Sequence, residues 1–215
     1  MLDFSCLFPA GAPDPQARWA RLRQLVTELA GAGVALLQYR NKPDSDVLVA
    51  QDALAIGAAL DSAAPSREHP HRMKLILNDR PSLVAPVGWD GVHVGQDDLA
   101  PAEARTILGP RALIGVSTHT DEQVRLAGSE PVDYIAIGPV FSTTSKTGAS
   151  PVIGLEGVER ARALTTKPLV AIGGITLENA ACVYDAGADS LAVISAIFSP
   201  GRDAGEAARA FLALL

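Results

Sequence analysis

The chain has 215 residues, of which 48% are hydrophobic and 20% are charged, a composition that favours one folded domain over residues 1–215 and argues against disorder. The formal net charge of −6 argues against a nucleic-acid-binding surface, which needs a basic footprint, but leaves a small phosphorylated substrate open. Cys6 and Cys182 lack metal-ligand spacing, the N-terminus lacks signal-peptide features, and no apolar run reaches membrane-spanning length. We therefore expect free thiols, a cytoplasmic location and no membrane partner.

Short apolar runs alternate with helical patterns along the whole chain. Most of these runs are nearly continuous in Val, Ile, Leu and Ala, which is typical of strands buried on both faces of a parallel sheet. The expected strands are 2–7, 34–39, 74–77, 91–94, 112–116, 134–137, 169–172 and 190–194. The expected helices are 15–31, 44–63, 101–108, 121–127, 155–164, 177–186 and 204–214, with a short turn after Pro81 and with Asp44, Thr120 and Thr176 as N-caps.

Eight strand–helix alternations in this length predict an α/β fold of the (β/α)₈ TIM-barrel type. The alternative is an open, doubly wound sheet, which would concentrate ligand-binding residues at one crevice. Polar residues follow at least six of the expected strands, and this distribution favours the barrel.

The second strand ends in Gln38-Tyr39-Arg40-Asn41-Lys42. Gln38, Arg40 and Lys42 alternate along the segment, so in an extended chain they point the same way. Two cations and an amide on one side can bind a diphosphate. The alternative is a strand that runs out into solvent, where Lys and Arg are usually found.

Two neighbouring strand ends offer carboxylates, Asp79 in Asn78-Asp79-Arg80 and Asp98 in Gly95-Gln96-Asp97-Asp98. Carboxylates without a nearby cysteine or histidine cluster suit a hard cation such as Mg²⁺. The alternative is that Asp97 or Asp98 caps the helix at Pro101. We expect His93, within the strand, to be a hydrogen-bonded residue of the barrel interior.

The segment Gly138–Gly148 contains Thr143, Thr144, Ser145 and Lys146 directly after an expected strand. Hydroxyls and backbone N–H groups bind anionic oxygens, and the lysine adds a mobile positive charge. A solvated Ser/Thr-rich connector is the alternative.

Further hydroxyls and glycines follow the fifth, seventh and eighth strands, at Ser117, Gly173–Gly174 and Ser195. The loops after strands seven and eight form the usual phosphate site of a TIM barrel. The residues thus indicate a metal-assisted diphosphate site and a metal-free monophosphate site. Two phosphorylated ligands facing each other suggest group transfer with release of pyrophosphate.

Together these segments resemble the thiamine phosphate synthase family, also called thiamine-phosphate pyrophosphorylase. The matching motifs are QYRNK at 38–42, LILNDR at 75–80, DGVHVGQDDL at 90–99, IGVSTHT at 114–120, DYIAIGPVFSTTSKTG at 133–148, VAIGGIT at 170–176 and ADSLAVISAIF at 188–198. The resemblance implies a TIM-barrel transferase of thiamine biosynthesis. Such an enzyme joins 4-amino-2-methyl-5-(diphosphooxymethyl)pyrimidine to 4-methyl-5-(2-phosphooxyethyl)thiazole, or its carboxylated form, and forms thiamine phosphate and pyrophosphate.

The resemblance also implies residue roles. Asp79 and Asp98 would bind Mg²⁺, and Lys146, Arg40 and Ser117 would be catalytic. The substrates would be bound by Gln38, Tyr39, Arg40, Asn41, Lys42, Asn78, Ser117, Thr143, Thr144, Ser145, Lys146, Gly174, Ile194 and Ser195. The family path would be dissociative, with pyrophosphate leaving before the thiazole nitrogen captures a pyrimidine-stabilised cation.

This chain departs from the family pattern at three places. Asn41 stands where an acidic residue is usual, Ser145 stands where threonine is usual, and the first strand lacks the usual Thr-Asp ending. Two rival functions are a thiazole tautomerase and a non-catalytic sensor of a phosphorylated ligand, since a fold does not fix a function. A homo-oligomer is a further open expectation.

Overall fold

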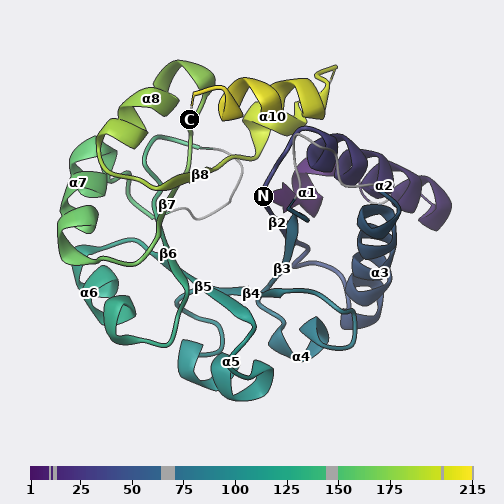
Figure 1. The fold of residues 1–215 in the computed structure, drawn as a ribbon, viewed down its shortest axis with the longest axis horizontal. Coiled ribbons are helices and arrows are strands. Elements are labelled where there is room, and N and C mark those ends of the chain that lie inside the picture. The colour runs from purple at the N-terminus through teal and green to yellow at the C-terminus, as the bar shows by residue number, and fades with distance from the viewer. Residues whose placement is uncertain (10, 12–13, 64–70, 144–149, 200, 215) are drawn as a thin grey trace.

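The computed structural model describes residues 1–9, 11, 14–63, 71–143, 150–199 and 201–214. Eight parallel strands form one sheet in the order β1 to β8, curled into a barrel with the helices around it (Figure 1). The strands are β1 (Leu2–Asp3), β2 (Leu36–Arg40), β3 (Lys74–Asn78), β4 (Gly91–Val94), β5 (Leu113–Thr118), β6 (Tyr134–Ile137), β7 (Leu169–Ile172) and β8 (Ser190–Ala192). The (β/α)₈ prediction is confirmed.

Helices connect successive strands and cover the outer surface of the barrel (Figure 1). They are α1 (Phe4–Leu7), α2 (Pro15–Gly31), α3 (Asp46–Ser62), α4 (Pro81–Val84), α5 (Pro101–Leu108), α6 (Asp121–Ser129), α7 (Gly154–Leu164), α8 (Leu177–Asp185), α9 (Ser195–Phe198) and α10 (Ala204–Leu212). No helix in the described part of the chain is long and apolar enough to cross a membrane.

Several expected boundaries are wrong by a few residues, and at two of them an aspartate has a tertiary partner. The first strand ends at Asp3 instead of residue 7, because the Asp3 carboxylate caps α1 by accepting a hydrogen bond from the Cys6 N–H at 3.2 Å. Helix α3 is capped by Ser45, not by Asp44. The Asp44 carboxylate instead contacts the Arg18 guanidinium at 2.8 Å.

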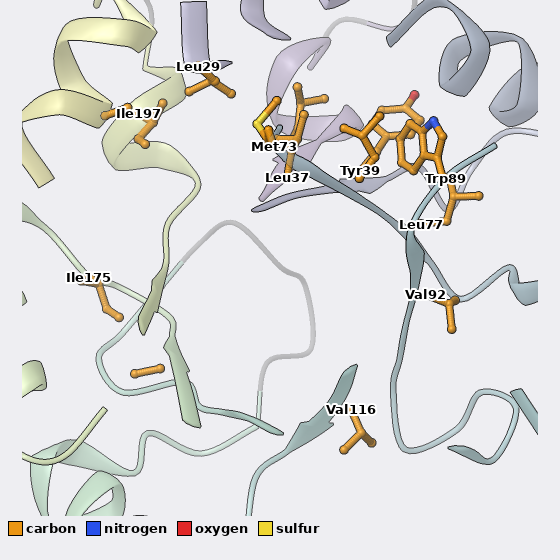
Figure 2. Close-up of a cluster of buried hydrophobic side chains, with 14 of the residues drawn as sticks. Leu29, Leu37, Tyr39, Met73, Leu77, Trp89, Val92, Val116, Ile175 and Ile197 are labelled. Atoms are coloured by element: carbon orange, nitrogen blue, oxygen red, sulfur yellow. The ribbon is translucent and has the colours of Figure 1, made fainter. Parts of the chain in front are cut away.

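The main core lies between the outer face of the sheet and the helices. Leu37 and Tyr39 of β2 belong to this layer, and Figure 2 shows Tyr39 beside Trp89 there. Their rings meet edge to face with centroids 6.5 Å apart, a favoured aromatic arrangement. Because side chains alternate along a strand, Gln38 and Arg40 of the same strand point into the barrel.

The two ends of the strand order, β1 and β8, approach each other beside this interior. The Met1 ammonium group donates a hydrogen bond to the Val193 carbonyl oxygen at 2.8 Å, just after β8. Burial lowers the pKa of this amino group to about 6, although the nearby Asp3 carboxylate opposes the effect.

Candidate functional site

The barrel encloses a cavity of about 580 Å³. Eight of the residues expected to bind substrate lie along its wall, and they come from six different strands or the loops that follow them. They are Gln38, Arg40, Asn78, Ser117, Thr143, Gly174, Ile194 and Ser195. The structure therefore brings together the residues that the strand-end pattern selected, although their contact with substrate stays a prediction.

A pair of buried amides lies at one side of the cavity. Gln38 Nε2 donates a hydrogen bond to Asn78 Oδ1 at 2.7 Å, which fixes the orientation of both side chains. The Asn78 amide nitrogen has no hydrogen-bond partner among the described residues, although the residue is only 6% exposed. Buried donors are rarely left unpaired in folded proteins, so this N–H group is available to a ligand acceptor.

Arg40 is held in place by a residue that none of the sequence motifs includes. Its Nη1 atom lies 2.6 Å from Asp3 Oδ2, and the Asp3 side chain is 1% exposed. A guanidinium paired with a buried carboxylate is confined to one orientation in the cavity wall. The sequence did contain a signal for this contact, because Asp3 is a polar residue near the start of an apolar run. The prediction of a strand over residues 2–7 passed over it.

Lys42, Asp79 and Asp98 form a second cluster, which follows the strand ends directly. The Lys42 ammonium lies 2.7 Å from Asp79 Oδ2 and 3.8 Å from Asp98 Oδ1. Burial raises the pKa of Asp79, a hydrogen-bond contact with the Asp98 carboxyl group raises it further, and Lys42 opposes both effects. The expected convergence of the two aspartates is therefore present in the structure.

The backbone fixes each carboxylate of this cluster. The Asp79 N–H donates to the His93 carbonyl oxygen of β4 at 2.9 Å, and Asp79 adopts a left-handed conformation with φ 62°. Asp98 Oδ2 accepts a hydrogen bond from the Gly95 N–H at 2.8 Å. The alternative that Asp97 or Asp98 caps α5 is wrong, because Ala100 occupies that position.

Ser117 is part of a hydrogen-bonded chain across the barrel. Its hydroxyl lies 2.8 Å from His93 Nε2, and His93 Nδ1 lies 3.0 Å from the Tyr134 hydroxyl. His93 is thus the buried, hydrogen-bonded residue that the sequence predicted. Burial raises the pKa of Tyr134 well above its ordinary range, so the phenol keeps its proton.

The loops after β6 and β7 touch backbone to backbone. The Phe141 N–H donates to the Gly173 carbonyl oxygen at 2.9 Å. A Cβ atom on Gly174, whose φ is +65°, would lie 2.5 Å from the Ser142 carbonyl oxygen. Gly174 is therefore required by the contact between the two loops, besides any approach of a ligand.

The remaining expected residues divide into three groups. Ile194 precedes α9 and Ser195 begins it, at the cavity wall. Thr144, Ser145 and Lys146 lie outside the described residues. Tyr39 and Asn41 are 1% exposed, and the Tyr39 hydroxyl is bonded to Asp52 and to Asn41 on the helix side of the sheet, so the substrate contact expected of these two residues stays a prediction.

In the described part of the chain, no group of three or more His, Cys, Asp or Glu side chains is placed to hold a metal ion. The pair Asp79 and Asp98 is the candidate instead. Mg²⁺ commonly takes only one or two protein carboxylates and completes its shell with water and substrate phosphate. A two-carboxylate cluster beside a cationic cavity wall fits that donor set.

Comparison with known proteins agrees with this arrangement. A family model described as thiamine monophosphate synthase matches residues 13–197. A thiamine-phosphate synthase of Koribacter versatilis is 49% identical over 181 residues, which cover 84% of this chain and 82% of the relative. One of Azorhizobium caulinodans is 40% identical over 188 residues, covering 87% and 84%.

A solved structure is also similar over nearly the full length. It is a thiamine phosphate pyrophosphorylase from Pyrococcus furiosus, with a TM-score of 0.77 and 25% sequence identity. The likeness covers 99% of this chain and 92% of the other. The strand-end residues, the barrel and these relatives lead to one conclusion: the chain belongs to the thiamine monophosphate synthase family.

Proposed function

We propose that this chain condenses a hydroxymethylpyrimidine diphosphate with a thiazole phosphate and releases thiamine phosphate and pyrophosphate. Its relatives named thiamine-phosphate synthase support this transferase activity. The observation that best supports it in the structure is that one cavity contacts Gln38, Arg40 and Asn78 as well as Gly174 and Ser195. Both substrates can then meet within one barrel.

The diphosphate belongs at the cationic side in this proposal. Arg40 and Lys42 face the negative charge that grows on the leaving pyrophosphate, and preorganised charges of this kind supply most of the rate enhancement in many enzymes. Arg40 is already oriented by Asp3, at 2.6 Å, so little reorganisation is needed when the substrate binds. The Asn78 amide N–H would donate to an acceptor on the pyrimidine substrate.

We assign Mg²⁺ to Asp79 and Asp98. The Lys42 ammonium lies 2.7 Å and 3.8 Å from these carboxylates, so the two aspartates already hold one cation between them. Bound Mg²⁺ would supply additional positive charge for the departing pyrophosphate. The carbon–oxygen bond breaks with its electron pair on pyrophosphate, and the thiazole nitrogen then forms the new carbon–nitrogen bond.

A pyrophosphate-release assay tests the reaction. The purified chain should release one pyrophosphate for each thiamine phosphate formed when both substrates are present. Each substrate alone is the control, and release with both substrates separates the synthase from a tautomerase or a ligand sensor. Absence of pyrophosphate release with both substrates would contradict the proposal.

Metal dependence is tested separately. Excess chelator should abolish pyrophosphate release, and added Mg²⁺ should restore it. Asp98→Asn should weaken Mg²⁺ activation, whereas the matched variant Asp97→Asn changes an exposed neighbouring carboxylate and should not. Full activity without divalent metal would refute the assignment.

A cytoplasmic location is part of the proposal. The chain has only two cysteines, Cys6 and Cys182, which lie far apart in the sequence, and such sparse cysteine usage is common in a reducing compartment. The small phosphorylated substrates follow from the family, while the homo-oligomer stays a prediction.

A further inference from the structure

The outer face of β2 holds a buried polar network that the reaction described above does not use. We call it the Asp52 network. The Tyr39 hydroxyl and the Arg18 guanidinium both donate to Asp52 Oδ2, and Trp19 Nε1 donates to Asp52 Oδ1 at 3.2 Å. Asp52 and Tyr39 are 1% exposed and Arg18 is 5% exposed. A carboxylate this deeply buried is stable only with such partners, so the side chains of the network are held in one arrangement.

The network continues into the segment that joins β2 to α3. Asn41 Nδ2 donates to the Tyr39 hydroxyl oxygen at 3.1 Å and to Asp44 Oδ2 at 3.0 Å. Tyr39 can accept this bond because its own proton is directed at Asp52. Burial, with the nearby Asp52 charge, raises the pKa of Tyr39 far above its ordinary range, so the hydroxyl stays a donor at any working pH.

The same segment is held from its other side by Arg80, the residue after Asp79. Arg80 Nη1 donates to the Asn41 carbonyl oxygen at 2.8 Å, and Nη2 donates to the Asp44 carbonyl oxygen at 3.0 Å. Residues 41–44 are thus fixed between the Asp52 network and the strand end that carries Asp79. Lys42 lies within this segment and reaches Asp79 at 2.7 Å.

We propose that Tyr39 and Asn41 are positioning residues, which hold Lys42 at the diphosphate-binding cluster through the Asp52 network. This inference rests on the proposed function, because it needs Lys42 to act on the diphosphate. It also accounts for Asn41, where the family pattern expects an acid. A carboxylate there could not donate to Tyr39 and would lie beside the carboxylate of Asp44.

The test begins with Tyr39→Phe, which removes one hydroxyl and leaves the ring beside Trp89 in place. Asp52 keeps its bonds to Arg18 and Trp19, so the fold should persist. We expect the KM for the pyrimidine diphosphate to rise about 3- to 10-fold, the size usual for groups coupled within one network, with the KM for the thiazole phosphate unchanged.

Trp19→Phe is the matched control. It removes another donor to the same Asp52 carboxylate, but the indole N–H of Trp19 is directed at Asp52 and not at residues 41–44, so the variant should lose thermal stability without a change in either KM. If Tyr39→Phe behaves in the same way as Trp19→Phe, the hydroxyl is only structural and the positioning inference is wrong.

Lys42→Ala decides whether Tyr39 acts through the lysine. The effect of Tyr39→Phe on the KM should disappear in the Lys42→Ala background, because the group being positioned is absent. An effect of the same size in that background would overturn the inference while leaving the proposed function intact. If Lys42→Ala alone changes neither KM nor turnover, the role proposed for Lys42 fails first, and the inference fails with it.

Discussion

Replacing Asp79 with asparagine should make the protein more stable and less active. The Asp79 side chain is 15% exposed, and its raised pKa shows that burial and Asp98 outweigh the favourable effect of Lys42. Lys42 is 47% exposed, so its ion pair contributes less than about 1 kcal/mol. Asparagine also tolerates the left-handed backbone at φ 62°. We expect a gain of about 1 kcal/mol, which corresponds to about 2–4 °C in Tm for a domain of this size.

The gain should depend on pH in a defined direction. Because the folded-state pKa of Asp79 lies above the ordinary 3.8, the folded protein binds the proton more readily than the unfolded chain between these two values. The unfavourable contribution of Asp79 to the wild-type free energy of unfolding is therefore lost as the pH falls through the raised pKa, and the wild type becomes more stable. The advantage of Asp79→Asn is full at neutral pH and disappears below the ordinary value.

Thermal unfolding of both proteins in metal-free buffer, from neutral to acidic pH, measures this difference. Asp97→Asn is the control, since Asp97 is exposed and adjacent to the cluster in sequence, and it should leave Tm unchanged. A lower Tm for Asp79→Asn at neutral pH would show that the ion pair with Lys42 dominates, and the electrostatic reasoning would be refuted.

Substitutions at three further positions test other parts of the site. Gly174→Ala should lower the free energy of unfolding by about 1–3 kcal/mol in urea, because the added Cβ would lie 2.5 Å from the Ser142 carbonyl oxygen; an unchanged midpoint would contradict the close packing of the loops. Asp3→Ala leaves the Arg40 guanidinium, which is 16% exposed, without its carboxylate partner. The free energy of unfolding should fall by about 3 kcal/mol, and kcat/KM should fall at least about 10-fold. Wild-type kinetics would mean that Arg40 needs no orientation by Asp3. Lys146→Ala should reduce kcat by about 10²- to 10³-fold in single-turnover pyrophosphate release, with partial recovery in Lys146→Arg; an unchanged rate would remove Lys146 from catalysis.

The barrel could be predicted from sequence because each strand is a short apolar run bounded by polar residues. The runs at Gly91–Val94, Tyr134–Ile137 and Leu169–Ile172 have the predicted limits. The first strand does not, since the apolar pattern continues past Asp3 and hides the one local signal, an aspartate that caps α1. What ends that strand is the Asp3 carboxylate, whose partner Arg40 is distant in sequence.

The candidate site shows the same division between local and distant information. Strand parity correctly placed Gln38 and Arg40 on the cavity wall. The motif as a whole also suggested Tyr39 and Asn41, although alternation along β2 turns Tyr39 outward to Asp52. Likewise, Asp44 and Ser45 are equally good caps by residue type, and only the contact between Asp44 and Arg18 distinguishes them.

Two backbone hydrogen bonds close the connection between β6 and α7 like a neck, and they bear on which changes in sequence length this connection can accept. The Ile153 N–H donates to the Pro139 carbonyl oxygen at 2.9 Å, and the Gly154 N–H donates to that of Val140 at 3.1 Å, so the chain leaves and re-enters the barrel at one point. Once such a neck is closed, each doubling of the number of residues between its ends costs only about 0.6 kcal/mol of chain entropy. Insertions between Thr143 and Ser150 should therefore leave the barrel folded. Natural selection on the sequence of that stretch can then act through its effect on the substrates alone.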